Sequence, residues 1–173
     1  MKNVFFYQMD IGRIGMAENG TAITNVYFNG GSPGDALLQE TDLLKEAGRQ
    51  LKDYLTGKRK TFELPLAPDG TEFQQKVWQS LQEIPYGETR SYGEVAKSIG
   101  NPQSSRAVGM ANHKNPIPIF IPCHRVIGAK GDLVGYAGGL SVKISLLKLE
   151  KQHANDYAQT ICRTGNSKKL PPS

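Results

Sequence analysis

The sequence predicts an α+β protein in which a small sheet-plus-helix module precedes a mostly helical domain. Three observations lead to this prediction. Short apolar patterns separated by glycines fill the first thirty positions. Helical spacing of apolar residues dominates most of the remaining chain. Residues 67–70, which contain proline and glycine, have the composition of a linker. We therefore expect domains at 1–66 and 67–155 and a loosely held tail at 156–173.

The N-terminal module is expected to contain three strands and one helix. Apolar patterns with flanking glycines predict strands at 2–8, 12–17 and 21–28. The sequence Glu-Asn-Gly-Thr at 18–21 suits the turn between the second and third strands. Helical spacing over 36–56 predicts a helix that ends at Gly57, and a short extended piece comes next at 61–66.

The second domain is expected to contain four short helices, at 71–81, 91–99, 104–113 and 141–152. The sequence Ser-Tyr-Gly-Glu at 91–94 fits a capping box. The turn at 100–102 contains glycine, so the second and third helices match a helix-turn-helix. The third helix is rich in small residues, which suits close approach to a groove or close packing against another helix: Ser104, Ser105, Ala107, Gly109 and Ala111.

Charge and cysteine content limit the possible function classes. Residues 1–66 hold eight basic and eight acidic side chains, so the net charge of +5 lies entirely in 67–173. This excess is typical of a polyanion-binding domain, although a solvated basic face explains it equally well. Two cysteines make no disulfide framework, and no Cys/His cluster has zinc spacing. The sequence has no apolar run long enough for a membrane span. A free cysteine suits a reducing compartment, so we expect a cytoplasmic protein, and we expect no bound metal.

A reactive cysteine is the most specific feature of the chain. Cys123 comes after a proline and precedes His124 and Arg125. Basic neighbours favour the nucleophilic thiolate, so a depressed pKa is expected for this thiol. Successive side chains on a strand point to opposite faces, so either the backbone turns sharply here or His124 acts through a water. Glu150 could complete a Cys–His–carboxylate chain.

Five ordered motifs give a resemblance to a known family: Asn115-Pro116, Pro122–Val126, the segments Ser-Arg-Ala-Val-Gly at 105–109 and Gly-Tyr-Ala-Gly-Gly-Leu at 135–140, and Leu-Leu-Lys-Leu-Glu at 146–150. Together they resemble the O6-alkylguanine-DNA alkyltransferases, also called methylated-DNA–protein-cysteine methyltransferases. The match is close over 71–152. Over 1–66 only the layout of strands and helix agrees.

The resemblance implies direct-reversal DNA repair by a suicide reaction. Cys123 would accept the alkyl group from O6-alkylguanine in double-stranded DNA and would work once. No cofactor is implied. The fold expected from the family is a ribonuclease-H-like N-terminal module followed by a winged-helix-like DNA-binding domain. A monomer is expected, and cooperative binding to DNA is left open.

The resemblance also assigns roles to individual residues. His124 would act through a water as the base, Glu150 would orient it, and Asn115 would hold the active-site turn. Tyr92 would give a proton to the leaving base or help to rotate its phosphate. Arg106 would fill the space of the extruded base, on a DNA-binding helix that includes Ser104, Ser105 and Ala107. The substrate pocket would contain Tyr136, Ala137 and the backbone of Val126.

One residue departs from the family pattern, and several alternative roles and functions stay open. Some family members carry a serine where this chain has Ala137, so one possible hydrogen bond to the alkylated oxygen is absent and the alkyl preference is open. Arg106 could also be a plain phosphate contact. The rival functions are a lesion-binding protein without transfer, a regulator that uses Cys123 as an alkylation sensor, and a cysteine hydrolase. The presence of a cysteine at 123 argues against the first.

Overall fold

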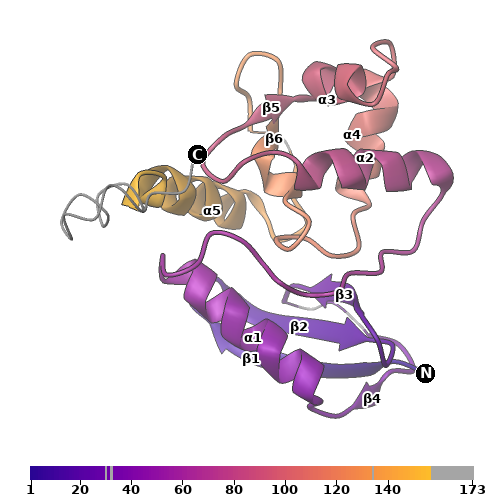
Figure 1. The fold of residues 1–173 in the computed structure, drawn as a ribbon, viewed down its shortest axis with the longest axis vertical. Helices are drawn as coiled ribbons and strands as arrows, with labels where there is room; N and C mark the ends of the chain where they lie inside the picture. The colour runs from indigo at the N-terminus through magenta and orange to yellow at the C-terminus, as the bar shows by residue number, and fades with distance from the viewer. Residues whose placement is uncertain (30, 32, 134, 157–173) are drawn as a thin grey trace, which may run out of the picture.

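The computed structural model describes residues 1–29, 31, 33–133 and 135–156, and it has the α+β architecture that the sequence predicts. Figure 1 shows a sheet covered by one long helix below a group of short helices, with the C-terminal helix beside that group. Of the predicted tail at 156–173, only Asp156 lies within the described residues.

The N-terminal sheet has the strand order β3-β2-β1-β4. Strands β1 and β3 both pair antiparallel with β2, and β4 pairs parallel with β1. Ile14 and Met16 of β2 are fully buried, so the sheet has an apolar face toward helix α1. The bounds are β1 Asn3–Met9, β2 Gly12–Glu18, β3 Ile23–Tyr27, β4 Leu37–Leu38 and α1 Asp42–Leu55.

The predicted helix at 36–56 begins too early, because residues 37 and 38 form β4 instead. Leu37 pairs with Asn3 of β1. Thr41 has an extended backbone, and its side chain accepts a hydrogen bond from the backbone N–H of Leu44. A threonine cap in this conformation marks the start of a helix. Helical spacing alone placed Leu37 in α1, although tertiary pairing to β1 fixes its conformation.

The chain after residue 70 contains the expected short helices, which are α2 Glu72–Gln82, α3 Tyr92–Ser98, α4 Ser105–His113 and α5 Leu140–His153. Capping boxes are present before α2, with Thr71, and before α3, with Ser91. Gly100 has a φ of 79° in the turn between α3 and α4, where a residue with a side chain would be strained. Helices α3 and α4 therefore form the predicted helix-turn-helix.

A small parallel sheet connects α3 to the cysteine motif. Strand β5 (Arg90–Ser91) pairs with strand β6 (Val126–Ile127), with Arg90 opposite Val126. Two residues are too few to show a period of two, so the sequence did not predict these strands. The pairing places the first residue of α3, Tyr92, beside the chain that leaves Cys123.

The two parts of the protein share one continuous apolar core. The backbone N–H of Val26 in β3 donates to the Pro116 carbonyl at 2.9 Å. Phe28 stacks edge to face on Tyr136, with ring centroids 5.7 Å apart. The N-terminal module therefore supports two of the segments that carry the sequence motifs.

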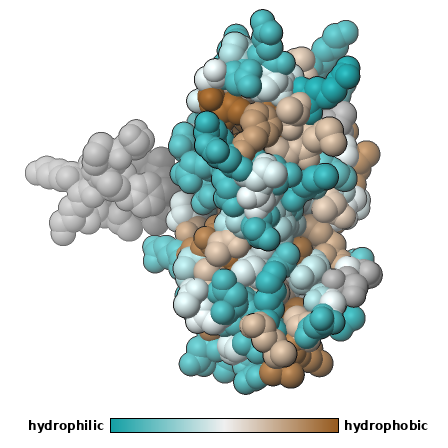
Figure 2. All heavy atoms as spheres, turned by 90° about the vertical axis from the view of Figure 1, so that its right-hand side faces the viewer, coloured by the Kyte–Doolittle hydropathy of each residue, from teal (hydrophilic) through white to brown (hydrophobic). Residues whose placement is uncertain are grey.

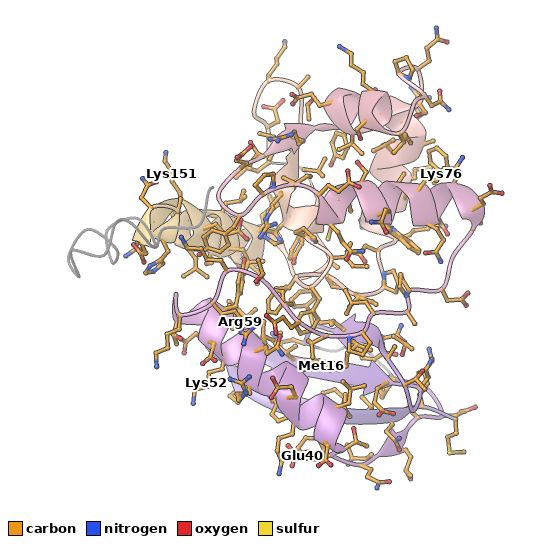
Figure 3. The ribbon with its side chains drawn as sticks, in the orientation of Figure 1. Met16, Glu40, Lys52, Arg59, Lys76 and Lys151 are labelled. Carbon is orange, nitrogen blue, oxygen red and sulfur yellow. The ribbon has the colours of Figure 1, made fainter. Side chains whose placement is uncertain are left out.

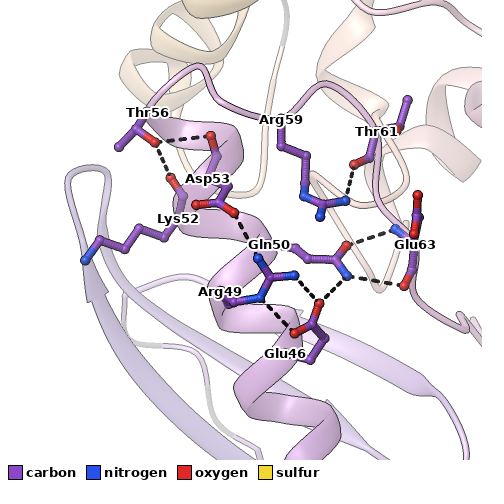
Figure 4. A network of polar contacts seen from close by, with 9 residues as sticks. All are labelled: Glu46, Arg49, Gln50, Lys52, Asp53, Thr56, Arg59, Thr61 and Glu63. Atoms are coloured by element: carbon purple, nitrogen blue, oxygen red, sulfur yellow. Dashed lines mark hydrogen bonds and ion pairs between the residues drawn. The ribbon is translucent and has the colours of Figure 1, made fainter.

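The connection after α1 is held to that helix by a polar network (Figure 4). Gln50 is 2% exposed, and its side chain bonds both the backbone N–H and the carbonyl of Glu63. Arg59 donates to the Thr61 carbonyl at 3.1 Å. These contacts fix the course of the chain between α1 and α2.

Large apolar side chains are exposed at scattered positions, among them Leu38, Met110 and Ile144. Figure 2 shows hydrophilic side chains over most of one face and smaller apolar areas near both ends. Lys52 of α1, Lys76 of α2 and Lys151 of α5 are exposed and point outward in Figure 3. No helix in the described part of the chain is long and apolar enough to cross a membrane.

Candidate active site

The cysteine motif forms a sharp turn. Residues Cys123–Arg125 make one turn of 3-10 helix, η1, in which the Arg125 N–H donates to the Pro122 carbonyl at 3.0 Å. Cys123 and His124 are 5% and 0% exposed. Of the two alternatives left by the sequence, a sharp backbone turn is therefore present. Participation of a water stays a prediction.

Asn115 braces the segment that leads to this turn. Its side chain donates to the Ile121 carbonyl at 2.8 Å and accepts from the Ile117 N–H at 2.9 Å. Ile119, between these two residues, has a φ of 75°, which is unfavourable for a β-branched side chain. Such a conformation costs about 1–3 kcal/mol and persists only when its surroundings enforce it. The contacts of Asn115 supply part of that enforcement.

Glu150 of α5 is the centre of a buried ionic network. It is 1% exposed, and its Oε2 accepts from His124 Nε2 at 2.7 Å. Arg125 donates to both carboxylate oxygens, through Nε at 2.8 Å and Nη2 at 2.9 Å. Burial alone would raise the pKa of Glu150, but the hydrogen bonds from His124 and Arg125 outweigh it and lower this pKa to about 2. The carboxylate therefore stays ionised.

The network fixes the tautomer of His124. An ionised carboxylate can only accept, so Nε2 carries the proton that is donated to Glu150. Nδ1 is then left as an acceptor, and it has no hydrogen-bond partner among the described residues. Burial lowers the pKa of His124 despite the opposing effect of Glu150. The ring is therefore neutral near pH 7 and has one free basic nitrogen.

The prediction that the pKa of Cys123 is lowered is wrong. Burial raises the pKa of the thiol to about 11, and the Asn115 side chain and the charge of Lys143 offset the burial only in part. The resting sulfur is therefore a thiol, and it needs a base to become nucleophilic. Lys143 lies in α5 with its side chain buried and donates to the Val126 carbonyl at 2.8 Å. Sequence reasoning did not single out this lysine.

A cavity of about 450 Å³ opens beside helix α4. Tyr92, Arg106 and Asn112 are among its lining residues, and Asn112 also donates to the Cys123 carbonyl at 3.4 Å. The cavity thus reaches a residue in direct contact with the cysteine. Burial raises the pKa of Tyr92, and a thiolate at Cys123 would raise it further.

The outer face of α4 is open and built from small or flexible side chains. Arg106 and Ala107 are exposed, and the predicted contact residues Ser104 and Ser105 are half-buried. A methyl group added at Gly109 would meet only the Tyr92 ring, at an ordinary 3.8 Å. Internal packing does not require this glycine to be small. This favours close approach of a ligand over close packing against another helix.

The three predicted pocket residues lie in different environments. Tyr136 is 9% exposed, and its hydroxyl has no partner among the described residues. Ala137 is exposed. The carbonyl of Val126 already accepts from Lys143, but a carbonyl has two lone pairs and can accept once more. The Tyr136 ring lies edge to face to the His124 imidazole, with ring centroids 6.5 Å apart, which places this phenol beside the cysteine motif.

The side chains around the cysteine do not form a metal centre. Within the described residues, no group of three or more His, Cys, Asp or Glu side chains is placed to hold a metal ion. The imidazole of His124 and the carboxylate of Glu150 instead contact each other.

A buried thiol next to a neutral histidine and beside a helix-turn-helix defines a class of DNA-binding proteins with a cysteine nucleophile. Comparison with known proteins narrows the class. The family model described as "6-O-methylguanine DNA methyltransferase, DNA binding domain" matches residues 72–152. The model of the ribonuclease-like domain of the same methyltransferase matches residues 5–68. The chain belongs to the methylated-DNA–protein-cysteine methyltransferase family.

Individual relatives agree with this assignment. The methylated-DNA–protein-cysteine methyltransferase of Methanosarcina acetivorans is 60% identical over 116 residues, which cover 67% of this chain and 74% of that protein. The constitutive enzyme of Bacillus subtilis is 55% identical over 114 residues, covering 65% and 69%. The crystal structure of Mycobacterium tuberculosis OGT in complex with DNA superposes with a TM-score of 0.83 at 44% identity, covering 87% of this chain and 94% of that one.

Proposed function

We propose that this protein repairs O6-alkylguanine in double-stranded DNA by moving the alkyl group irreversibly to Cys123. The observation that carries the proposal is the hydrogen bond from His124 to Glu150. It leaves Nδ1, which has no partner in the described part of the chain, as a base in the turn that holds the thiol. A thiol with a pKa of about 11 requires such a base at neutral pH.

The proposed reaction balances without a co-reactant. His124 Nδ1 takes the thiol proton, through a water, as the Cys123 sulfur attacks the alkyl carbon. A sulfur–carbon bond forms while the bond from that carbon to guanine O6 breaks, and its electron pair goes to the base. Tyr92 donates a proton to the leaving guanine and is reprotonated from His124. The thioether has no route back to a thiol, so each molecule turns over once.

DNA binding is proposed to use the outer face of α4. A base stacked in a duplex must be flipped out before the buried sulfur can reach it, which costs a few kcal/mol. Exposed Arg106 would occupy the space that the base leaves, and Ala107 and Gly109 would allow the helix to approach a groove closely. Minor-groove binders commonly deform DNA in this way. Contacts mainly to phosphates would make binding independent of sequence.

We infer that the protein acts as a monomer in the cytoplasm, where a reducing environment keeps Cys123 free. The thiol supplies the nucleophile and the proton, so the proposed reaction has no step for a cofactor or a metal.

The test uses a duplex that carries O6-methylguanine with a labelled methyl group. Wild-type protein should acquire one label per molecule, and Cys123→Ala should bind the duplex and acquire none. Cys162→Ser is the matched control, since this second cysteine lies outside the described residues and has no proposed role; it should retain transfer. Label on Cys123→Ala would refute the proposal. Binding by wild-type protein without transfer would favour a lesion-binding function instead.

A further inference from the structure

We propose that Tyr54, which belongs to the N-terminal module, is a positioning residue for the base that activates Cys123. The inference rests on the proposed function and deepens it. It assigns to residues 1–66 a direct part in the active site, through one hydroxyl group that reaches the His124–Glu150 pair.

Tyr54 contacts the carboxylate oxygen that accepts the hydrogen bond from His124. Its hydroxyl donates to Glu150 Oε2 at 2.5 Å, the same oxygen that accepts from His124 Nε2, and it lies 3.4 Å from that nitrogen. Tyr54 and Glu150 are 0% and 1% exposed, so no bulk water competes for these lone pairs. Arg125 Nη2 also donates to Oε2, so three donors from the described residues share this oxygen.

The fold holds the tyrosine in place from several directions. Its ring packs against Phe62 at 5.2 Å and edge to face against Tyr86 at 6.1 Å. Just beyond it, Gly57 has a φ of 81°, and a methyl group there would lie 2.6 Å from the His153 ring of α5. Lys60 also donates to the carbonyl of the residue after α5.

The C-terminal ends of α1 and α5 are thus held together, and Figure 1 shows them on neighbouring sides of the boundary between the two parts of the protein. Tyr54 and Glu150 both lie in the last turns of these helices. This arrangement fixes the distance between the phenol and the carboxylate.

The hydroxyl has two consequences for His124. It helps to fix the position of Oε2, and hence the orientation of the imidazole that donates to it. The hydrogen bond also offsets part of the negative charge on Oε2. The carboxylate therefore stabilises a protonated His124 less than it would without this donor, and the pKa of His124 is lower. Tyr54 thereby helps to keep the base neutral. The other titratable or charged groups around the cluster are Cys123, Arg125, Lys143, Tyr86 and Tyr136.

Tyr54→Phe tests the proposal with little change in packing. The single-turnover rate of methyl transfer should fall about tenfold at pH 7, because a hydrogen bond to a charged group is lost. The acidic limb of the pH–rate profile should move to higher pH, because His124 becomes easier to protonate. Tyr86→Phe is the matched control. The Tyr86 hydroxyl is buried and has no hydrogen-bond partner among the described residues, so its removal should leave both measurements unchanged.

A second readout separates this proposal from the proposed function. The rate at which iodoacetamide alkylates Cys123, followed by mass spectrometry of its peptide, reports activation of the thiol without DNA. Tyr54→Phe should slow this reaction and shift its acidic limb in the same direction. Failure of the wild-type protein to transfer methyl groups would refute the proposed function alone, since the iodoacetamide profile would still decide the role of Tyr54.

A double-variant comparison tests whether Tyr54 acts through Glu150. In a Glu150→Gln background, Tyr54→Phe should change the iodoacetamide rate less than about twofold, because contacts in one network are not additive. An undiminished effect in that background would overturn the proposal. A wild-type pH profile for Tyr54→Phe, or equal losses in Tyr54→Phe and Tyr86→Phe, would also overturn it.

Discussion

Replacing Arg125 by methionine should destabilise the protein by about 3–5 kcal/mol, because the change leaves Glu150 buried without its permanent positive partner. Arg125 makes two hydrogen bonds to the Glu150 carboxylate and a third, at 2.7 Å, to the Ile84 carbonyl. Methionine fills part of the space and donates none of them. The unpaired Ile84 carbonyl accounts for about 1–3 kcal/mol of the loss. The rest comes from the buried carboxylate, which keeps neutral donors such as Tyr54 but loses its positive charge partner.

The matched control is Arg49→Met on α1. Arg49 also contacts two carboxylates, Glu46 and Asp53, but its side chain is 54% exposed. Exposed pairs contribute about 0–1 kcal/mol, so this variant should remain close to the wild type. Urea unfolding at pH 7, followed by far-ultraviolet circular dichroism, measures both free energies of unfolding. Equal losses in Arg49→Met and Arg125→Met would refute the assignment of a buried ionic network.

The loss of unfolding free energy caused by Arg125→Met should become smaller as the pH falls. Without the guanidinium, burial raises the pKa of Glu150, so the carboxylate in the variant takes up a proton at a higher pH than in the wild type. Once it is neutral, burying it without a positive partner costs less. A loss that is constant from pH 7 to pH 4 would show that packing, rather than charge, explains the effect.

Three further predictions concern neighbouring groups. Asn115→Ala should lower the free energy of unfolding by about 2–3 kcal/mol, because both hydrogen bonds across the strained turn are lost; a loss below about 0.5 kcal/mol would contradict this. Lys143→Met should raise the pKa of Cys123 further and slow its alkylation by iodoacetamide at pH 8, whereas an unchanged rate would show that this charge does not affect the sulfur. The wild type should lose about 3 kcal/mol of stability between pH 4.5 and 2, since the folded pKa of Glu150 is lowered to about 2. Glu150→Gln should lack that part of the acid dependence in the same urea titrations.

Local patterns in the sequence predicted most of the fold. The capping box at Ser91 and the glycine turn at Gly100 depend on residues within a few positions of one another, and both are present. The start of α1 was predicted wrongly because β4 depends on pairing with β1, which helical spacing does not report. Strands β5 and β6 were missed because two residues carry no periodicity.

The candidate site was predictable only as a set of residues. The sequence suggested Cys123, His124 and Glu150, but it predicted the wrong protonation state for the sulfur, because that state depends on burial. Lys143 shares the buried face of α5 with Leu146 and Glu150, but a lysine side chain is ordinarily exposed, so its residue type gave no signal. Tyr54 fitted the apolar stripe of α1, although a buried phenol needs a partner for its hydroxyl, and that requirement was the available signal. Its partner lies 96 positions along the chain, a separation that no local pattern spans.

The central claim is that Cys123 accepts an alkyl group from DNA once and keeps it. Intact mass spectrometry after incubation with excess O6-methylguanine duplex tests it most directly. Every active molecule should gain the mass of one methylene group, located on the peptide that contains Cys123, and no further gain should occur with time. An unchanged mass while the methylated base disappears from the duplex, or repair of more lesions than there are protein molecules, would contradict the claim.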